Sequence, residues 1–206
     1  MPSRGTGFRF FSAVLAFAAS QAAAQPDGSI VERLLEGGLV LYMRHVSTDF
    51  TQNDASSRSY EDCANQRNLT DKGRDEARAL AAQAKRLGIP VGEVLASPLC
   101  RTMETARLAF GNATPMTEVR GGPARPEDPA RYEPLRKLLS TSFPRGKNLV
   151  IVSHGNPFYA LAGPPYLAEG EVAVVQPQGG GRFTVVARIR LEDWPNLAVK
   201  GTASRS

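Results

Sequence analysis

Three short apolar runs in this chain stop abruptly at polar residues. Residues 39–43 lead into His45, residues 92–96 lead into a serine, and residues 148–153 lead into His154. Runs of this length that are rich in β-branched residues are typical of buried β-strands. The pattern therefore predicts three strands, each of which carries a polar side chain beyond its carboxyl end.

The segments between these runs have the spacing of amphipathic helices. The clearest helix lies between Thr70, which suits an N-cap, and Gly88, which suits a C-terminal stop. Ser97 is a second candidate N-cap, and it precedes a helix expected over residues 98–109. The other expected helices are residues 30–35, residues 129–141 and a short stretch after His154.

The chain ends in two further strand patterns, residues 172–175 and 182–191, which a glycine-rich turn joins. This arrangement predicts an antiparallel hairpin. Strands that alternate with helices predict a mostly parallel sheet. The fold class is therefore α/β, a three-layer sandwich with a mostly parallel central sheet, helices on both faces and a C-terminal antiparallel hairpin.

Two long polar segments, residues 46–69 and 111–130, interrupt the alternation of strands and helices. The first has no strong periodicity, and the second is rich in proline and glycine and holds one strand-like piece, residues 116–119. Connections of this length inside a compact domain are usually functional loops. We therefore expect both segments to form the rim of a substrate site.

Residues 1–24 have the layout of a secretory signal peptide. Two arginines precede the apolar stretch 10–19, which is too short to span a bilayer, and three alanines ending at Ala24 suit cleavage. An uncleaved membrane anchor is the alternative. We expect export to the periplasm or beyond, with residues 25–206 as a single domain whose core covers about residues 39–190 and has no membrane span.

Charge and cysteine content narrow the function classes. The 25 basic and 20 acidic residues give a mild positive excess without the clustering that nucleic-acid binding requires, so no nucleic-acid partner is expected. Cys63 and Cys100 are the only cysteines. An even count in an exported protein favours a disulfide, and two unrelated buried thiols are the alternative.

The only two histidines of the chain, His45 and His154, follow two of the predicted strands. Ligands of open α/β sheets bind at the carboxyl ends of the strands, so we expect both histidines to meet there with Arg44 and Arg101. Arginine binds phosphate oxygens with a planar fork, and a neutral imidazole is a nucleophile. The constellation suits phosphoryl transfer, in which His45 attacks phosphorus and His154 stabilises charge in the transition state.

Four motifs occur in order along the chain. They are Arg44-His45-x-x-Thr48, Leu69-Thr70-x-x-Gly73-x-x-x-Ala77, Ser97-Pro98-x-x-Arg101-x-x-x-Thr105-Ala106 and Val152-Ser153-His154-Gly155. Together they resemble the histidine phosphatase superfamily, the phosphoglycerate-mutase-like group, and within it a small exported bacterial branch. The resemblance implies a phosphohistidine on His45, a phosphate pocket completed by Arg44, Arg101 and His154, and no metal or other cofactor.

Several site assignments stay open at this point. Thr48 and Asn156 are candidate phosphate donors or turn residues. Val46 stands where the family usually has glycine or alanine, and a β-branched residue there either crowds the phosphate or reshapes the loop. The proton donor for the leaving group is Glu127 or, as an alternative in a later turn, Glu171. The further acidic residues in the loop around Glu127 are Glu118, Asp128 and Glu133.

Together these observations predict a phosphomonoester hydrolase that acts on a small phosphorylated substrate. The alternatives are a phosphomutase and a non-catalytic phosphate-binding protein of the same fold. A zinc site from two histidines and two cysteines fits poorly, because the cysteines lack the short paired spacing of zinc ligands and Arg44 would repel a cation. The sequence leaves the substrate and the oligomeric state open.

Overall fold

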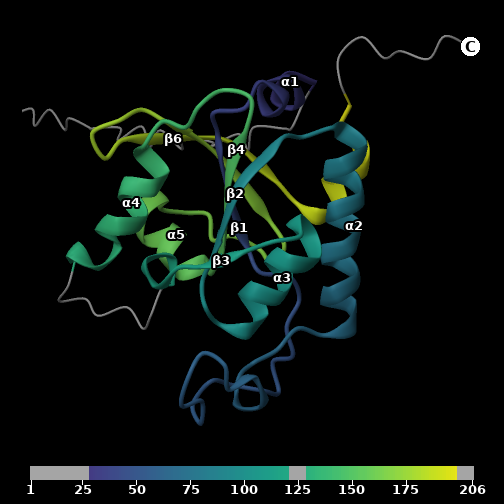
Figure 1. Ribbon diagram of the computed structural model, residues 1–206, viewed down its shortest axis with the longest axis vertical. Coiled ribbons are helices and arrows are strands. Elements are labelled where there is room, and N and C mark those ends of the chain that lie inside the picture. The colour runs from purple at the N-terminus through teal and green to yellow at the C-terminus, as the bar shows by residue number, and fades with distance from the viewer. Residues whose placement is uncertain (1–27, 121–128, 199–206) are drawn as a thin grey trace, which may run out of the picture.

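The computed structural model describes residues 28–120 and 129–198 (Figure 1). The expected signal peptide at residues 1–24 and the candidate donor Glu127 lie outside the described residues. One six-stranded sheet has the order β3-β2-β4-β1-β5-β6. Its strands are β1 (Val40–Arg44), β2 (Val91–Ala96), β3 (Thr114–Pro115), β4 (Asn148–Ser153), β5 (Val172–Pro177) and β6 (Phe183–Ile189).

Strand pairing follows the predicted mixture of directions. The pairs β1–β4, β4–β2 and β2–β3 are parallel, whereas β5 pairs antiparallel with β1 and β6 pairs antiparallel with β5. The predicted α/β sheet with its C-terminal hairpin is therefore confirmed.

The helices cover both faces of the sheet. The α-helices are α1 (Gly28–Glu36), α2 (Asp71–Leu87), α3 (Cys100–Phe110), α4 (Glu133–Ser140) and α5 (Gly155–Ala162), and the short 3-10 helices are η1 (Cys63–Asn65), η2 (Thr117–Val119), η3 (Pro129–Tyr132) and η4 (Leu191–Asn196). Helices α1, α2 and α3 lie on one side of the sheet, and α4 and α5 lie on the other (Figure 1). No helix in the described parts of the chain is both long and apolar enough to cross a membrane.

Side chains of successive residues in the central strands point to opposite faces of the sheet and pack into two separate cores. In β1, Leu41 and Met43 pack with the α1–α3 side, whereas Val40 and Tyr42 pack with the α4–α5 side. Both faces of the strand are buried because helices cover both faces of the sheet, and this explains the continuous apolar run.

Helix α2 matches its sequence signals closely. The Thr70 hydroxyl accepts a hydrogen bond from the Gly73 amide at 3.0 Å, and Gly88 ends the helix in the left-handed conformation with φ 70°. Both signals lie within a few residues of the ends of the helix, so the local sequence is enough to predict them.

Three local predictions were wrong. Ser97 does not cap α3, since the N-cap is Leu99 and the Ser97 side chain is buried within the fold instead. The strand-like piece at residues 116–119 forms η2, because β3 pairs with β2 over only two residues and Val119 turns into the α4–α5 core. The single helix expected over residues 129–141 is η3 followed by α4, with a proline in the first turn of α4.

Candidate active site

His45 and His154 lie next to one another at the carboxyl end of the sheet. Strands β1 and β4 are parallel neighbours, and their last residues, Arg44 and Ser153, are partners in the register. The two histidines follow directly, with ring centroids 5.5 Å apart and an interplanar angle of 67°. Only 1% of His45 and 9% of His154 is exposed. The fold thus places two imidazoles in one buried position.

The backbone fixes the protonation of the His45 ring. Nδ1 of His45 lies 2.9 Å from the carbonyl oxygen of Val46. A carbonyl oxygen can only accept, so Nδ1 carries the proton and Nε2 keeps its lone pair. Nε2 makes no hydrogen bond with the residues that the structure describes, which leaves it available as a nucleophile.

His154 is held by different groups. Its Nε2 lies 2.9 Å from the Ser97 hydroxyl, and its carbonyl oxygen accepts a hydrogen bond from the Tyr42 hydroxyl at 2.8 Å. Ser97 follows β2, which is the parallel neighbour of β4 on the side away from β1. Three adjacent strand ends therefore supply Ser97, His154 and His45 in a row.

Both imidazoles are kept neutral by their surroundings. Burial lowers the pKa of His45 to about 3, with further lowering from the positive charges of Arg101, Arg44 and Arg67. Burial also lowers the pKa of His154 well below its ordinary value, and the charges of His45, Arg101, Arg67 and Arg120 act in the same direction. A neutral imidazole is the form that attacks phosphorus.

Arg101 lies close enough to this histidine pair for its charge to lower the pKa of both imidazoles, and it is itself 6% exposed. Its two terminal nitrogens bind the Asp54 carboxylate at 2.9 and 3.0 Å, and Nη1 also donates to the Arg67 carbonyl at 3.3 Å. Nε is buried and has no partner among the described residues. The side-on edge of the guanidinium therefore keeps a donor, Nε–H, that no described residue satisfies.

Arg44 is fixed by the segment that precedes β5. It donates to the Leu167 carbonyl at 2.8 Å and lies 3.5 Å from the Glu169 carboxylate. The same carboxylate accepts from the Thr48 hydroxyl at 2.7 Å and lies 3.8 Å from Nδ1 of His45. Glu169 thus links three residues of the Arg44-His45-x-x-Thr48 motif.

The motif around Gly73 positions the loop that follows the nucleophile. The Ser47 carbonyl accepts from the Thr70 amide at 3.1 Å, and a Cβ on Gly73 would collide with that carbonyl oxygen. Glycine at this position lets α2 approach the loop. Two motifs that lie far apart in the sequence therefore form one packed contact behind His45.

The side chain of Val46 lies away from the phosphate position. It is fully buried in the core that the sheet shares with α1, α2 and α3. The backbone of Val46 faces His45, and its side chain faces the core. The β-branched residue therefore packs beneath the loop.

The predicted disulfide between Cys63 and Cys100 is present, with Cα atoms 5.7 Å apart. It ties the loop over residues 46–69 to the first residue of α3. The buried Gln66 adds a second tie, because its Oε1 accepts from the Cys100 amide at 2.9 Å. These ties hold Asp54 and Arg67 against Arg101.

The other candidate proton donors, and the candidate phosphate ligand Asn156, each make different contacts. Glu171 is buried and binds Arg188 at 2.7 Å and the Ala168 amide at 2.7 Å. Glu118 is exposed on η2, and Glu133 pairs with a neighbouring arginine on α4. Asn156 is exposed in the first turn of α5, where its side-chain oxygen accepts from the Tyr166 hydroxyl at 2.7 Å.

Sequence reasoning missed four charged residues of this site. Glu169 lies in the turn over residues 168–171, two residues before Glu171, which is the alternative donor that the sequence predicted from this turn. Asp54 and Arg67 lie in the aperiodic loop, and Arg120 lies after η2, where its charge also lowers the pKa of His154. The only local signal for Arg67 and Arg120 was their charge within two loops predicted to form the rim.

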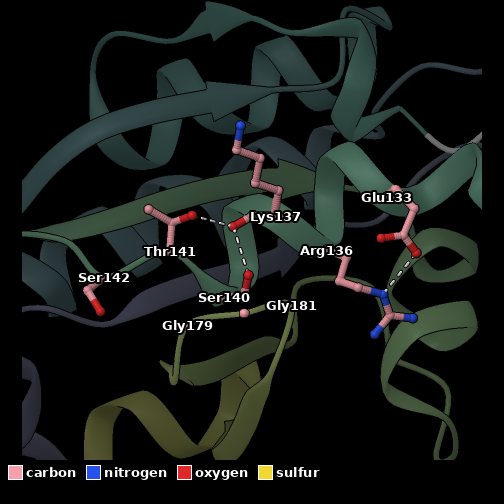
Figure 2. Close-up of a pocket in the computed structure, with 9 residues that line it drawn as sticks. Glu133, Arg136, Lys137, Ser140, Thr141, Ser142, Gly179 and Gly181 are labelled. Atoms are coloured by element: carbon pink, nitrogen blue, oxygen red, sulfur yellow. Dashed lines mark hydrogen bonds and ion pairs between the residues drawn. The ribbon is translucent and has the colours of Figure 1, made fainter.

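A surface hollow of about 490 Å³ lies away from the histidines, between α4 and the turn that joins β5 to β6. Figure 2 shows its lining, where Arg136 pairs with Glu133 and the Lys137 carbonyl accepts from the hydroxyls of Ser140 and Thr141. These contacts are internal to one helix. None of the residues that line the hollow is one of the nucleophilic groups described above.

Comparisons with known proteins agree with this arrangement. The family model of the histidine phosphatase superfamily (branch 1) matches residues 40–123, a span that holds His45 and Arg101. No curated protein matches the chain.

Several solved structures share the fold. The protein histidine phosphatase SixA complexed with tungstate has 21% identity and a TM-score of 0.51, covering 75% of this chain and 98% of that one. A candidate α-ribazole-5′-P phosphatase from Escherichia coli K-12 has 16% identity and a TM-score of 0.56, with coverages of 75% and 98%. A mycobacterial glucosyl-3-phosphoglycerate phosphatase with inorganic phosphate has 16% identity and a TM-score of 0.52, with coverages of 76% and 99%. These likenesses concern the fold, and the fold extends over nearly the whole length of each of those chains.

Proposed function

We propose that this chain is a histidine phosphatase that hydrolyses a small phosphomonoester through a covalent phosphohistidine on His45, since the model of that superfamily matches residues 40–123. One observation carries the proposal. The Val46 carbonyl holds the proton of the His45 ring on Nδ1, so that Nε2 has a free lone pair beside His154, and the buried Nε of Arg101 has no partner among the described residues.

The phosphoryl group binds first. Its oxygens take the Nε–H and Nη2–H of Arg101, a charge-assisted fork of the kind that suits phosphate. Arg44 adds positive charge next to His45, and Asn156 offers its amide nitrogen at the start of α5. Thr48 acts through the carboxylate of Glu169, since its hydroxyl donates there.

His45 then attacks phosphorus with Nε2, and the ester oxygen leaves in line with the attack. The Ser97 hydroxyl lies 2.9 Å from Nε2 of His154, and the proposal assigns it as the donor there. Nδ1–H of His154 is then the group that donates to a phosphoryl oxygen as charge develops. Water hydrolyses the phosphohistidine in a second step and releases inorganic phosphate.

Two solved relatives of the fold support the substrate class. One of them is a complex with tungstate, an oxyanion, and the other is a complex with inorganic phosphate. The disulfide between Cys63 and Cys100 supports an oxidising compartment, which agrees with the proposed export of residues 25–206 after removal of the signal peptide.

A phosphate-release screen over a panel of phosphomonoesters tests this function. The best substrate, labelled with radioactive phosphate, is mixed with the protein and quenched in alkaline detergent, because a phosphorus–nitrogen bond survives alkali and breaks in acid. We expect label on the protein that is stable to alkali, labile to acid and located on His45 by mass spectrometry. Tight phosphate binding without turnover would instead support a non-catalytic binder, and transfer to a second hydroxyl acceptor would support a phosphomutase.

A further inference from the structure

The reaction needs one more group, because an alkoxide leaves poorly without a proton. The donor must lie near the phosphoryl group on the side opposite Nε2 of His45, since the leaving oxygen departs in line with the attack. Its carboxyl group must also reach solvent, because the proton that it gives up has to be replaced.

The two carboxylates of the turn over residues 168–171 do not meet these conditions. Glu171 is only 5% exposed and is buried against Arg188 and the Ala168 amide, so its carboxyl group does not reach solvent. Glu169 lies 3.8 Å from Nδ1 of His45, the ring nitrogen turned away from the attack. A group behind the nucleophile cannot reach the leaving oxygen in front of it.

Asp54 is the carboxylate beside the proposed phosphate-binding arginine. It binds the end-on edge of the Arg101 guanidinium through Nη1 and Nη2 and also accepts from the Arg67 amide, whereas the buried Nε on the side-on edge has no partner among the described residues. Two anions on adjacent edges of one guanidinium share Nη2 and become neighbours. A phosphoryl group on the free edge would therefore lie beside the Asp54 carboxyl, which is 38% exposed and open to solvent.

We propose that Asp54 is the general acid for the leaving group and the general base for the water that follows, a role that rests on the proposed phosphatase function. In the empty site, burial alone would raise the pKa of Asp54. Hydrogen bonds and the charges of Arg101 and Arg67 outweigh burial and hold that pKa below its ordinary value. A phosphoryl dianion on Arg101 opposes this lowering, so the arrival of substrate favours proton uptake from solvent.

The two steps then balance. In the first step, Nε2 of His45 bonds to phosphorus, the phosphorus–oxygen ester bond breaks, and the Asp54 proton passes to the leaving oxygen to give an alcohol. In the second step, the Asp54 carboxylate takes a proton from water, the water oxygen bonds to phosphorus, and the phosphorus–nitrogen bond breaks. Neutral His45, inorganic phosphate and protonated Asp54 result.

The test compares two leaving groups in the full mature protein with Asp54→Asn. An alkyl phosphate needs a protonated leaving oxygen, whereas 2,4-dinitrophenyl phosphate releases a stable phenolate without help. The readout is kcat/KM, which reports the phosphorylation step. We expect a loss of about 10²- to 10⁴-fold on the alkyl phosphate and less than about tenfold on the aryl phosphate.

Glu61→Gln is the matched control, because Glu61 is an exposed carboxylate on the same loop. It should leave both rates within about twofold. Asp54→Glu keeps the acid and should recover activity selectively on the alkyl phosphate, which guards against a variant that merely disturbs the loop.

Equal losses on both substrates in Asp54→Asn, or no loss on either, would overturn the role of Asp54 while leaving the phosphatase function intact. A wild-type protein that turns over neither substrate and forms no phosphoenzyme would overturn the function itself, and this is seen before any variant is made.

Discussion

His45 and His154 occupy the same position on neighbouring parallel strands, yet their hydrogen bonds differ. His45 uses Nδ1 to bind a backbone carbonyl and leaves Nε2 free, whereas His154 uses Nε2 to bind the Ser97 hydroxyl. The backbone of His154 is also held by Tyr42. The fold makes the two residues alike in place and burial, and their immediate partners make them different in chemistry.

The end of the strand therefore determines the position of each imidazole. The neighbouring carbonyl or hydroxyl determines which ring nitrogen can react. A carbonyl partner forces one tautomer, while a hydroxyl partner can either donate or accept. The proposed division into a nucleophile and a charge-stabilising residue follows from that asymmetry. Variants at each histidine test this asymmetry.

The largest effect is expected for His45→Ala. Removal of the nucleophile should lower kcat by about 10⁴-fold or more and abolish the labelled phosphoenzyme. Steady-state phosphate release measures the rate, and thermal unfolding checks that the fold persists. A variant that keeps a tenth of the wild-type rate would show that His45 is not the attacking group.

His154→Ala should cost less and in a different way. Loss of one donor to the developing charge is expected to lower kcat by about 10²- to 10³-fold. The phosphoenzyme on His45 should still form in rapid-quench experiments, only more slowly. If His154→Ala removed the phosphoenzyme as completely as His45→Ala, the two histidines would not have separate roles.

Acid stability probes the burial that both histidines share. The pKa of His45 falls from 6.5 to about 3 in the folded protein, so the unfolded chain takes up a proton that the folded protein excludes. The stabilisation is complete above pH 6.5 and is lost as pH falls from 6.5 towards 3. Urea unfolding from pH 7 to pH 4 should show a pH dependence that is smaller in His45→Asn by about 1.4 kcal/mol per pH unit. An unchanged slope would mean that His45 titrates normally in the folded state.

The smallest effect is expected for Ser97→Ala. The hydroxyl no longer sets the tautomer of His154, and a loss of about one hydrogen bond should lower kcat/KM by about 3- to 10-fold. Ser140→Ala is the control, because Ser140 is another buried serine whose hydroxyl binds a carbonyl of its own helix. An equal loss in both variants would indicate a general effect of removing a buried hydroxyl.

The sequence predicted those parts of the fold whose causes are local. Apolar runs defined β1, β2 and β4, and Thr70 and Gly88 bounded α2 because caps act within a few residues. Ser97 was misread because its partner, His154, becomes a neighbour only when β2 and β4 pair.

The predicted site was less complete for the same reason. Glu169 and Glu171 face different ways because the Gly170 amide donates to the carbonyls of Arg44 and His45, a contact between distant segments. Asp54 reaches Arg101 only through a loop that the disulfide and Gln66 hold in place. No pattern within residues 46–69 encodes that position.

The carbonyl of Val46 explains how this chain accommodates a β-branched residue directly after its proposed nucleophile. Every amino acid brings the same carbonyl to that place, so the ring proton of His45 is set by the path of the main chain and is insensitive to the side chain that follows. Substitutions at position 46 should therefore be judged by how they fill the core beneath the loop, and this position is open to redesign for stability without altering the tautomer on which catalysis depends.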